Sequence, residues 1–297
     1  MSKGRVLHEM ARQGVDVLLL GREANARYVS GAHRLFLAGE RAFAPGCVVV
    51  RETAAVHLLA VTDFGVPAEI GRHNLYPPSW SPATLIGRVA AVPGVASAAR
   101  VGVDGLTPVF EELLVAHLPG ADLVDGEAVM RAVRQIKSDD EVALIRAAAG
   151  VAQKVIMAAL HAIGAGRTDD TIKAVAMEAM AAEGTTTAAF EPRIHRKGGR
   201  VTVAVGVLRD GWEADLTRTT PGPDRPDALT AAIARCRPGT AVAEIGADTH
   251  GIGLGYEVLP YDAVLEPGMV LSVGTDSARD VVLVSDDGPE VLTAPGL

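Results

Sequence analysis

The stretch Arg131-Ala-Val-Arg-Gln-Ile-Lys-Ser-Asp-Asp-Glu-Val-Ala-Leu-Ile-Arg-Ala-Ala148 lies near the middle of the chain, where the sequence pattern changes. Ser138 and Glu141 within it form a capping box. The serine hydroxyl accepts a hydrogen bond from the N–H of residue 141, and the glutamate carboxylate reaches back to the serine N–H. Apolar residues then recur at helical spacing as far as Ile163. The stretch therefore predicts the start of a long helix and of a second domain.

Upstream of this point, short apolar runs alternate with segments of helical character. The expected strands are residues 15–20, 47–50, 55–61 and 99–103, and the expected helices are residues 5–13 and 108–118. The second and third strands have the spacing of a hairpin pair. Alternation of this kind is typical of an α/β domain with a substantially parallel sheet, which we place at residues 1–134.

Downstream, helices give way to strands. A second helix is expected from Thr168 to Gly184, and the clearest strands are residues 201–207, 270–273 and 281–284. A run of helices followed by a run of strands favours an α+β domain over residues 135–297.

The composition limits the classes of partner. The chain has 297 residues with 28 Lys and Arg against 36 Asp and Glu, a net charge of -8, which argues against nucleic-acid or anionic-membrane partners. The first residues do not have the pattern of a signal peptide, and no run reaches the ~20 apolar residues of a membrane span. Cys47 and Cys236 are poor material for a disulfide framework. We expect a cytoplasmic protein acting on a small molecule.

The central stretch and three later ones occur together in one known superfamily. The later stretches are residues 210–219 (Asp-Gly-Trp-Glu-Ala-Asp-Leu-Thr-Arg-Thr), 249–254 (Thr-His-Gly-Ile-Gly-Leu) and 265–273 (Leu-Glu-Pro-Gly-Met-Val-Leu-Ser-Val). In this order they resemble the creatinases, prolidases and Xaa-Pro aminopeptidases. The resemblance implies an N-terminal α/β domain, a pita-bread C-terminal domain and a homodimer whose partner borders the active site. The C-terminal domain is shortened, with 30 residues between Thr219 and His250.

The chain departs from this superfamily at the metal ligands. Typical members hold two metal ions with two aspartates, one histidine and two glutamates. By resemblance, Asp215 and His250 keep two of these positions, whereas Ala204, Gly274 and Arg279 replace the other three. A guanidinium at a metal position adds Coulomb repulsion to the loss of ligands. We expect no metal and no other cofactor.

Three residues are candidates for proton transfer. His250 lies in the best-preserved motif, and a histidine changes charge near neutral pH. Asp215 could orient the imidazole, or it could pair with Arg218 as a structural residue. Glu257 stands where the family has a second histidine, and a carboxyl beside Tyr256 in an apolar cleft could have a raised pKa. A framework histidine and a solvated loop glutamate remain the structural alternatives.

The remaining candidates are one further catalytic histidine, His195, and three residues for substrate binding. Arg279 suits a substrate carboxylate or an internal salt bridge to Asp215. His195 falls where metal-independent creatinases carry their catalytic histidine, and a basic surface turn is its structural alternative. Arg41 aligns with an arginine that holds the substrate carboxylate in creatinases, and Tyr256 adds a pocket aromatic.

The leading functional hypothesis is a metal-independent, creatinase-like enzyme rather than a dinuclear metallopeptidase. It would carry out C–N hydrolysis or a related elimination on a small polar, carboxylate-bearing substrate, by acid/base catalysis through His250. One alternative is a catalytically silent binding or scaffold protein on the same fold. Another is a mononuclear metallohydrolase built from Asp215, His250 and either Glu257 or Asp280.

Overall fold

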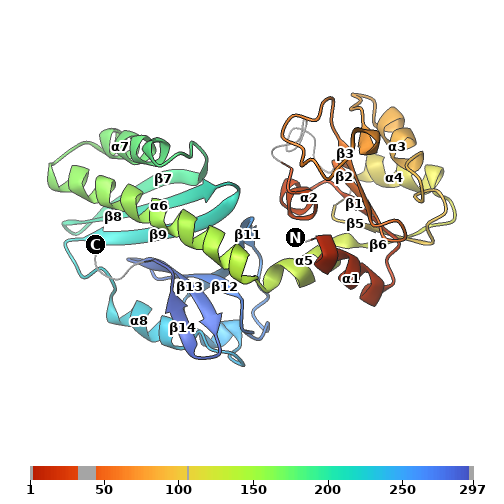
Figure 1. The fold of residues 1–297 in the computed structure, drawn as a ribbon. Coiled ribbons are helices and arrows are strands. Elements are labelled where there is room, and N and C mark those ends of the chain that lie inside the picture. The colour runs from red at the N-terminus through yellow and green to blue at the C-terminus, as the bar shows by residue number, and fades with distance from the viewer. Residues whose placement is uncertain (1–2, 33–44, 106, 294–297) are drawn as a thin grey trace. The chain divides into compact units, whose positions relative to one another are not determined.

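A computed structural model describes residues 3–32, 45–105 and 107–293. The chain divides into two compact units, residues 1–134 and 135–297, and each is described by itself (Figure 1).

The N-terminal unit is built on a six-stranded sheet in the order β4-β3-β2-β1-β5-β6. Its strands are β1 Val17–Leu20, β2 Cys47–Val50, β3 Ala55–Leu59, β4 Leu75–Tyr76, β5 Arg100–Val103 and β6 Asp122–Asp125. The pairs β1–β5, β5–β6 and β3–β4 are parallel, whereas β1–β2 and β2–β3 are antiparallel. The sheet is therefore mixed, because the hairpin of β2 and β3 is inserted next to the parallel strands.

Helices pack on this sheet through apolar residues. They are α1 Lys3–Gln13, α2 Glu23–Ser30, η1 Arg72–Asn74, α3 Pro82–Ala90, α4 Pro108–His117 and α5 Gly126–Gln135. Leu85 and Ile86 of α3 and Leu114 of α4 form one buried cluster with Val17 and Leu19 of β1. Prolines at the first turns of α3 and α4 suit positions where a backbone N–H has no helical partner.

The C-terminal unit begins with the capped helix that the sequence predicts. In α6, Asp139–Gly164, the Ser138 hydroxyl accepts from the Glu141 N–H and the Glu141 carboxylate accepts from the Ser138 N–H. This helix and α7, Asp169–Ala182, precede the strands β7 Ala188–Lys197, β8 Arg200–Arg209 and β9 Trp212–Thr220. By length and composition α6 could cross a membrane. Its buried apolar side packs on β8 and β9, as expected of a core helix in a soluble protein.

The rest of the unit completes an eight-stranded sheet in the order β11-β10-β12-β13-β9-β8-β7, with β14 paired to β13. The remaining elements are α8 Asp227–Ala234, η2 Val242–Glu244, β10 Asp248–Gly253, β11 Gly255–Glu257, β12 Val270–Gly274, β13 Arg279–Ser285 and β14 Gly288–Val291. Residues of α8 pack with β12 and β13 in a second core, which contains Leu229, Ile233, Leu271 and Val282. The two cysteines are free and buried, Cys47 in the first unit and Cys236 in the second.

The first prediction concerns the cap of α6. Ser138→Ala removes the side-chain acceptor for the Glu141 N–H, so we expect the free energy of unfolding to fall by about 1 kcal/mol. Ser138→Asp supplies a carboxylate acceptor in place of the hydroxyl and should restore most of the lost stability. Urea denaturation followed by circular dichroism measures both, and an alanine variant as stable as the parent would contradict the assignment of this cap.

Candidate functional site

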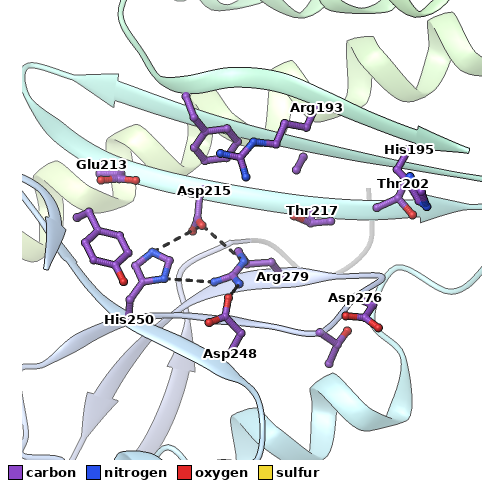
Figure 2. A pocket seen from close by; sticks show the side chains of 14 residues that line it. Arg193, His195, Thr202, Glu213, Asp215, Thr217, Asp248, His250, Asp276 and Arg279 are labelled. Atoms are coloured by element: carbon purple, nitrogen blue, oxygen red, sulfur yellow. Dashed lines mark hydrogen bonds and ion pairs between the residues drawn. The ribbon is translucent and has the colours of Figure 1, made fainter. Parts of the chain in front are cut away.

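A pocket of about 430 Å³ opens on the C-terminal sheet (Figure 2). Its walls come from β7, β8, β9, β10, β11, the first residue of β13 and the connection from β12 to β13. Ionisable side chains of both signs line it, namely Glu213, Asp215, Asp248, Asp276, Arg193, His195, His250 and Arg279. This volume falls within the range of small-molecule sites.

The alternation of β9 decides which of its side chains reach the pocket. Side chains of successive strand residues point to opposite faces of a sheet. Glu213, Asp215 and Thr217 line the pocket. Ala214 and Leu216, which alternate with them, are buried on the opposite face, where α6 packs. The acidic side chains therefore lie in the pocket because of the same alternation that buries the apolar ones under α6.

Asp215, His250 and Arg279 meet at the centre of the pocket. One carboxylate oxygen of Asp215, Oδ2, lies 3.8 Å from His250 Nε2 and 3.7 Å from Arg279 Nε (Figure 2). The other oxygen, Oδ1, is buried without a hydrogen-bond partner among the described residues. The His250 ring stacks on Tyr256, with 4.4 Å between ring centroids. Asp215 is thus close to two cation-forming groups without a short hydrogen bond to either.

Arg279 is held more tightly by other partners. Its Nη1 donates to Ser272 Oγ at 2.7 Å, and its Nη2 forms an ion pair with Asp248. Gly274 is its direct cross-strand partner. A Cβ placed on Gly274 would lie 2.5 to 2.6 Å from three atoms of the guanidinium group. The guanidinium group therefore packs directly on the Cα of Gly274. A Cβ at position 274 would take up the space that this group fills.

Two pocket groups have shifted pKa values. Burial, followed by the nearby carboxylates of Asp215 and Glu257, raises the pKa of Glu213 to about 7. Burial lowers the pKa of His250 more than the carboxylate of Asp215 raises it. Near neutral pH the pocket thus contains a neutral imidazole and a glutamate close to its titration midpoint.

The residues present do not fit the dinuclear metal site that the resemblance implies. No group of three or more His, Cys, Asp or Glu side chains in the described part of the chain is arranged to hold a metal ion. The guanidinium group of Arg279 lies between Asp215 and Asp248, where a bound cation would have to be. The unshared oxygen of Asp215 is one donor, which is too few for such a site.

The mononuclear set considered from the sequence is not brought together either. Asp280 is fully buried and accepts from Arg218 Nη2 at 2.7 Å, from Arg225 Nε at 2.8 Å and from Thr293 Oγ1 at 2.6 Å. It does not line the pocket. Its carboxylate is committed to a network that joins β13 to β9 and to the segment before α8.

Glu257 also lies outside the pocket lining. Its carboxylate pairs with Lys137 Nζ at 2.6 Å, and the Lys137 side chain is almost wholly buried. Gly251 and Gly253 make room for it, because a Cβ on either would lie within 3.0 Å of Glu257 atoms. The glycines of the Thr249-His-Gly-Ile-Gly-Leu stretch therefore allow a close approach, and the approaching group is the Glu257 side chain.

The other predicted residues are placed as follows. His195 and Tyr256 line the pocket with His250, Asp215 and Arg279. Arg41 lies outside the described residues. Asp248, Ser272 and Glu213 are residues of the site that sequence reasoning did not select. Each lies two positions from a residue that the sequence did single out: Asp248 from His250, Glu213 from Asp215 and Ser272 from Gly274. Because strand residues two apart share a face, this spacing could have identified them.

Comparison with known proteins identifies relatives for both units. The family model described as the creatinase/prolidase N-terminal domain matches residues 4–136. A probable dipeptidase, PepE, of Mycobacterium tuberculosis is 28% identical over 262 residues, covering 68% of this chain and 70% of the relative. The Xaa-Pro dipeptidase of Pyrococcus horikoshii is 22% identical, covering 97% of this chain and 95% of the relative.

Solved structures share the fold over nearly the whole chain. The prolidase from Pyrococcus furiosus superposes with a TM-score of 0.78 at 20% identity, covering 99% of both chains. The prolidase from Pyrococcus horikoshii gives a TM-score of 0.77 at 18% identity, covering 99% of this chain and 98% of the other. The expected fold class, an α/β domain followed by an α+β pita-bread domain, is confirmed.

These comparisons contradict the hypothesis of a metal-independent, creatinase-like enzyme. The relatives are named dipeptidase or Xaa-Pro dipeptidase, which points to peptidase function. The hypothesis was wrong because it inferred a reaction from the missing metal ligands. Those positions describe what the chain can coordinate, and they carry no information about which substrate the rest of the pocket accepts.

The second prediction tests the contact between Gly274 and Arg279 by a double-mutant cycle. Gly274→Ala should lower the free energy of unfolding by roughly 1 to 3 kcal/mol, because the new methyl group displaces the guanidinium group from its partners. In an Arg279→Ala background the same change should be neutral, or stabilising by up to about 1 kcal/mol, since glycine in a strand costs conformational entropy.

Chemical denaturation of the four proteins gives the coupling energy. Equal costs of Gly274→Ala in both backgrounds would show that the guanidinium group does not rest on Gly274.

The third prediction concerns pH. The folded-state pKa of Glu213 is about 7 against a reference value of 4.5, so the folded state binds this proton more tightly than the unfolded state. This contribution to stability is complete below pH 4.5 and is lost as the pH rises towards 7. When the pH rises from 4.5 to 8, the parent should therefore lose roughly 2 to 3 kcal/mol of its free energy of unfolding that Glu213→Gln does not lose. Parallel stability profiles of the two proteins between these pH values would contradict the assignment.

Proposed function

Because the chain belongs to the creatinase, prolidase and Xaa-Pro aminopeptidase superfamily, we propose that it binds short peptides and hydrolyses their peptide bond. The binding site is the pocket on the C-terminal sheet that Glu213, Asp215 and Arg279 line. Its relatives are hydrolases named for dipeptides, which supports the substrate class. The observation that carries the proposal is the presence of both signs of charge in one small cavity. A dipeptide is a zwitterion, so a pocket with acidic and basic sides complements both of its ends.

The acidic side consists of Glu213 and Asp215 on β9. Asp215 has a buried oxygen without a partner among the described residues. Because that oxygen is buried, a donor from a bound ligand would reach the carboxylate through Oδ2, which lies 3.8 Å from His250 Nε2 and 3.7 Å from Arg279 Nε and so has no short hydrogen bond to either. The ammonium group of a peptide is such a donor, and we place the amino end of the substrate on this side.

The basic side is formed by Arg193 and His195 on β7. The guanidinium group of Arg193 lies over the ring of Phe190, with Cζ 4.6 Å from the ring centroid. This contact orients a planar group with several donors, which suits a carboxylate. We place the carboxyl end of the peptide here, so that the peptide bond lies between the two sides.

The homodimer and the cytoplasmic location remain predictions. The packing of α6 on β8 and β9 supports a soluble protein without specifying its compartment.

The fourth prediction is that the purified protein cleaves dipeptides. A panel of Xaa-Pro and other dipeptides at about 1 mM, near the upper end of common KM values, should yield free amino acids detectable by mass spectrometry. The assay is run with chelator and, separately, with added Mn²⁺, Co²⁺ or Zn²⁺, and cleavage in either condition supports the proposal. Absence of cleavage in every condition, together with no dipeptide binding by calorimetry, would refute it.

Arg193 provides a matched test of the basic side. Arg193→Ala should weaken dipeptide binding, or raise KM, by roughly ten- to a hundredfold, as expected for the loss of a charged hydrogen bond. Arg196 on the same strand pairs with Asp169 and does not line the pocket. Arg196→Ala should therefore leave binding unchanged, and equal effects of the two substitutions would contradict the placement of the carboxylate.

A further inference from the structure

One face of the hairpin formed by β7 and β8 carries a row of basic side chains that begins in the pocket and continues to the hairpin turn. Arg193, His195 and Lys197 alternate along β7, so they share a face, and the first two line the pocket (Figure 2). Arg200 on β8 is the cross-strand partner of Lys197 and lies on the same face. We call these four exposed residues the cationic row.

An irregularity in the pairing of β7 with β8 sets the direction of the row. The register shifts between Phe190 and Arg193, and both residues line the pocket although they are an odd number of positions apart. Beyond the shift the pairing is regular. Arg196 alternates with the row and pairs with Asp169 at the start of α7, at 2.7 Å. The basic residue on the helix side of the strand therefore has a counter-charge.

The basic residues on the pocket side do not. The guanidinium group of Arg193 contacts only the ring of Phe190, and Arg200 Nε donates to the carbonyl oxygen of Pro221 at 3.2 Å. Among the residues that the structure describes, no carboxylate forms an ion pair with any member of the cationic row. The chain as a whole has a net charge of -8, so this row is a local excess of positive charge in an acidic protein.

The hairpin turn holds two of these charges opposite each other. Gly198 and Gly199 have φ angles of 57° and 76°, as a two-residue type I′ turn requires. This turn fixes Lys197 and Arg200 as a direct cross-strand pair. Like charges in such a pair destabilise a sheet, and an anion bound between them would remove the repulsion.

We propose that the cationic row selects peptides whose carboxyl-terminal residue is aspartate or glutamate. The inference rests on the proposed function, which places the terminal carboxylate of the peptide at Arg193 and His195. Residues two apart on a strand are separated by about 7 Å, so the next positive charges along the row lie one short side chain away. The side-chain carboxylate of an acidic last residue reaches Lys197 and Arg200, which have no carboxylate partner within the described chain.

The test compares three dipeptides on the full chain, Ala-Glu, Ala-Gln and Glu-Ala, at low ionic strength, where exposed charges are screened least. Affinity is measured by calorimetry, or as KM where the peptide is cleaved. Ala-Glu should bind roughly tenfold more tightly than Ala-Gln, as expected for two exposed ion pairs. Glu-Ala has the composition and charge of Ala-Glu but carries its acidic side chain at the amino end, beside Glu213 and Asp215, so it should bind more weakly than Ala-Glu.

Variants assign this preference to the row. Lys197→Gln combined with Arg200→Gln should lower the affinity for Ala-Glu to about that for Ala-Gln. Arg196→Gln removes one positive charge from the other face of the same strand and should leave the ratio of the two affinities unchanged. All three side chains are exposed, so these variants should fold, and their melting temperatures are measured alongside.

The outcomes separate this inference from the proposed function. If the parent binds Ala-Glu and Ala-Gln equally, the inference is overturned and the proposed function stands. If it binds none of the three dipeptides, both are overturned. The inference also fails if Glu-Ala binds as tightly as Ala-Glu, or if the double variant keeps the preference of the parent.

Discussion

The ion pairing of Arg279 with Asp215 and Asp248 is the interaction on which the pocket depends. Asp215 on β9 is buried and Asp248 on β10 is largely exposed, and a cation between them balances both charges. The guanidinium group supplies that cation from within the chain. Its position is fixed by its strand register and by the missing side chain of Gly274. The pocket therefore has its central charge as soon as the sheet is formed.

The next residue, Asp280, anchors the same point from the other face of the sheet. Its carboxylate is fully buried and accepts from Arg218, Arg225 and Thr293, while Arg218 Nη1 also donates to the carbonyl oxygen of Arg279 at 2.8 Å. A buried charge that loses its partner is costly, so this network restrains β13 against β9. Because successive side chains of β13 point to opposite faces, Arg279 lines the pocket and Asp280 lies in the buried network beneath it.

The sequence predicted features that depend on local spacing. The capping box at Ser138 and the main helices and strands appear where periodicity and turn residues placed them. It could not predict pairings between distant segments. The mixed order of the first sheet follows from such pairings, and so does the position of Glu257. Tyr256 and Glu257 are neighbours on β11, so their side chains point to opposite sides of the strand. Tyr256 stacks on His250, whereas Glu257 pairs with Lys137, 120 residues earlier in the chain. Asp248 and Ser272 were missed because their role depends on reaching Arg279 across the sheet.

The replacements at residues 274 and 279 of the metal ligands that the resemblance implies are physically linked. Residues 274 and 279 are direct cross-strand partners, so their side chains would share one volume above the sheet. The resemblance implies a glutamate at each of these two positions. An arginine at 279 brings a positive charge to the remaining carboxylates, and in its observed conformation its guanidinium group leaves no room for a Cβ on residue 274. A glutamate at 274 would collide with this conformation of Arg279. The two replacements are therefore compatible together, and they keep the centre of the pocket near electrical balance while the fold around it is retained.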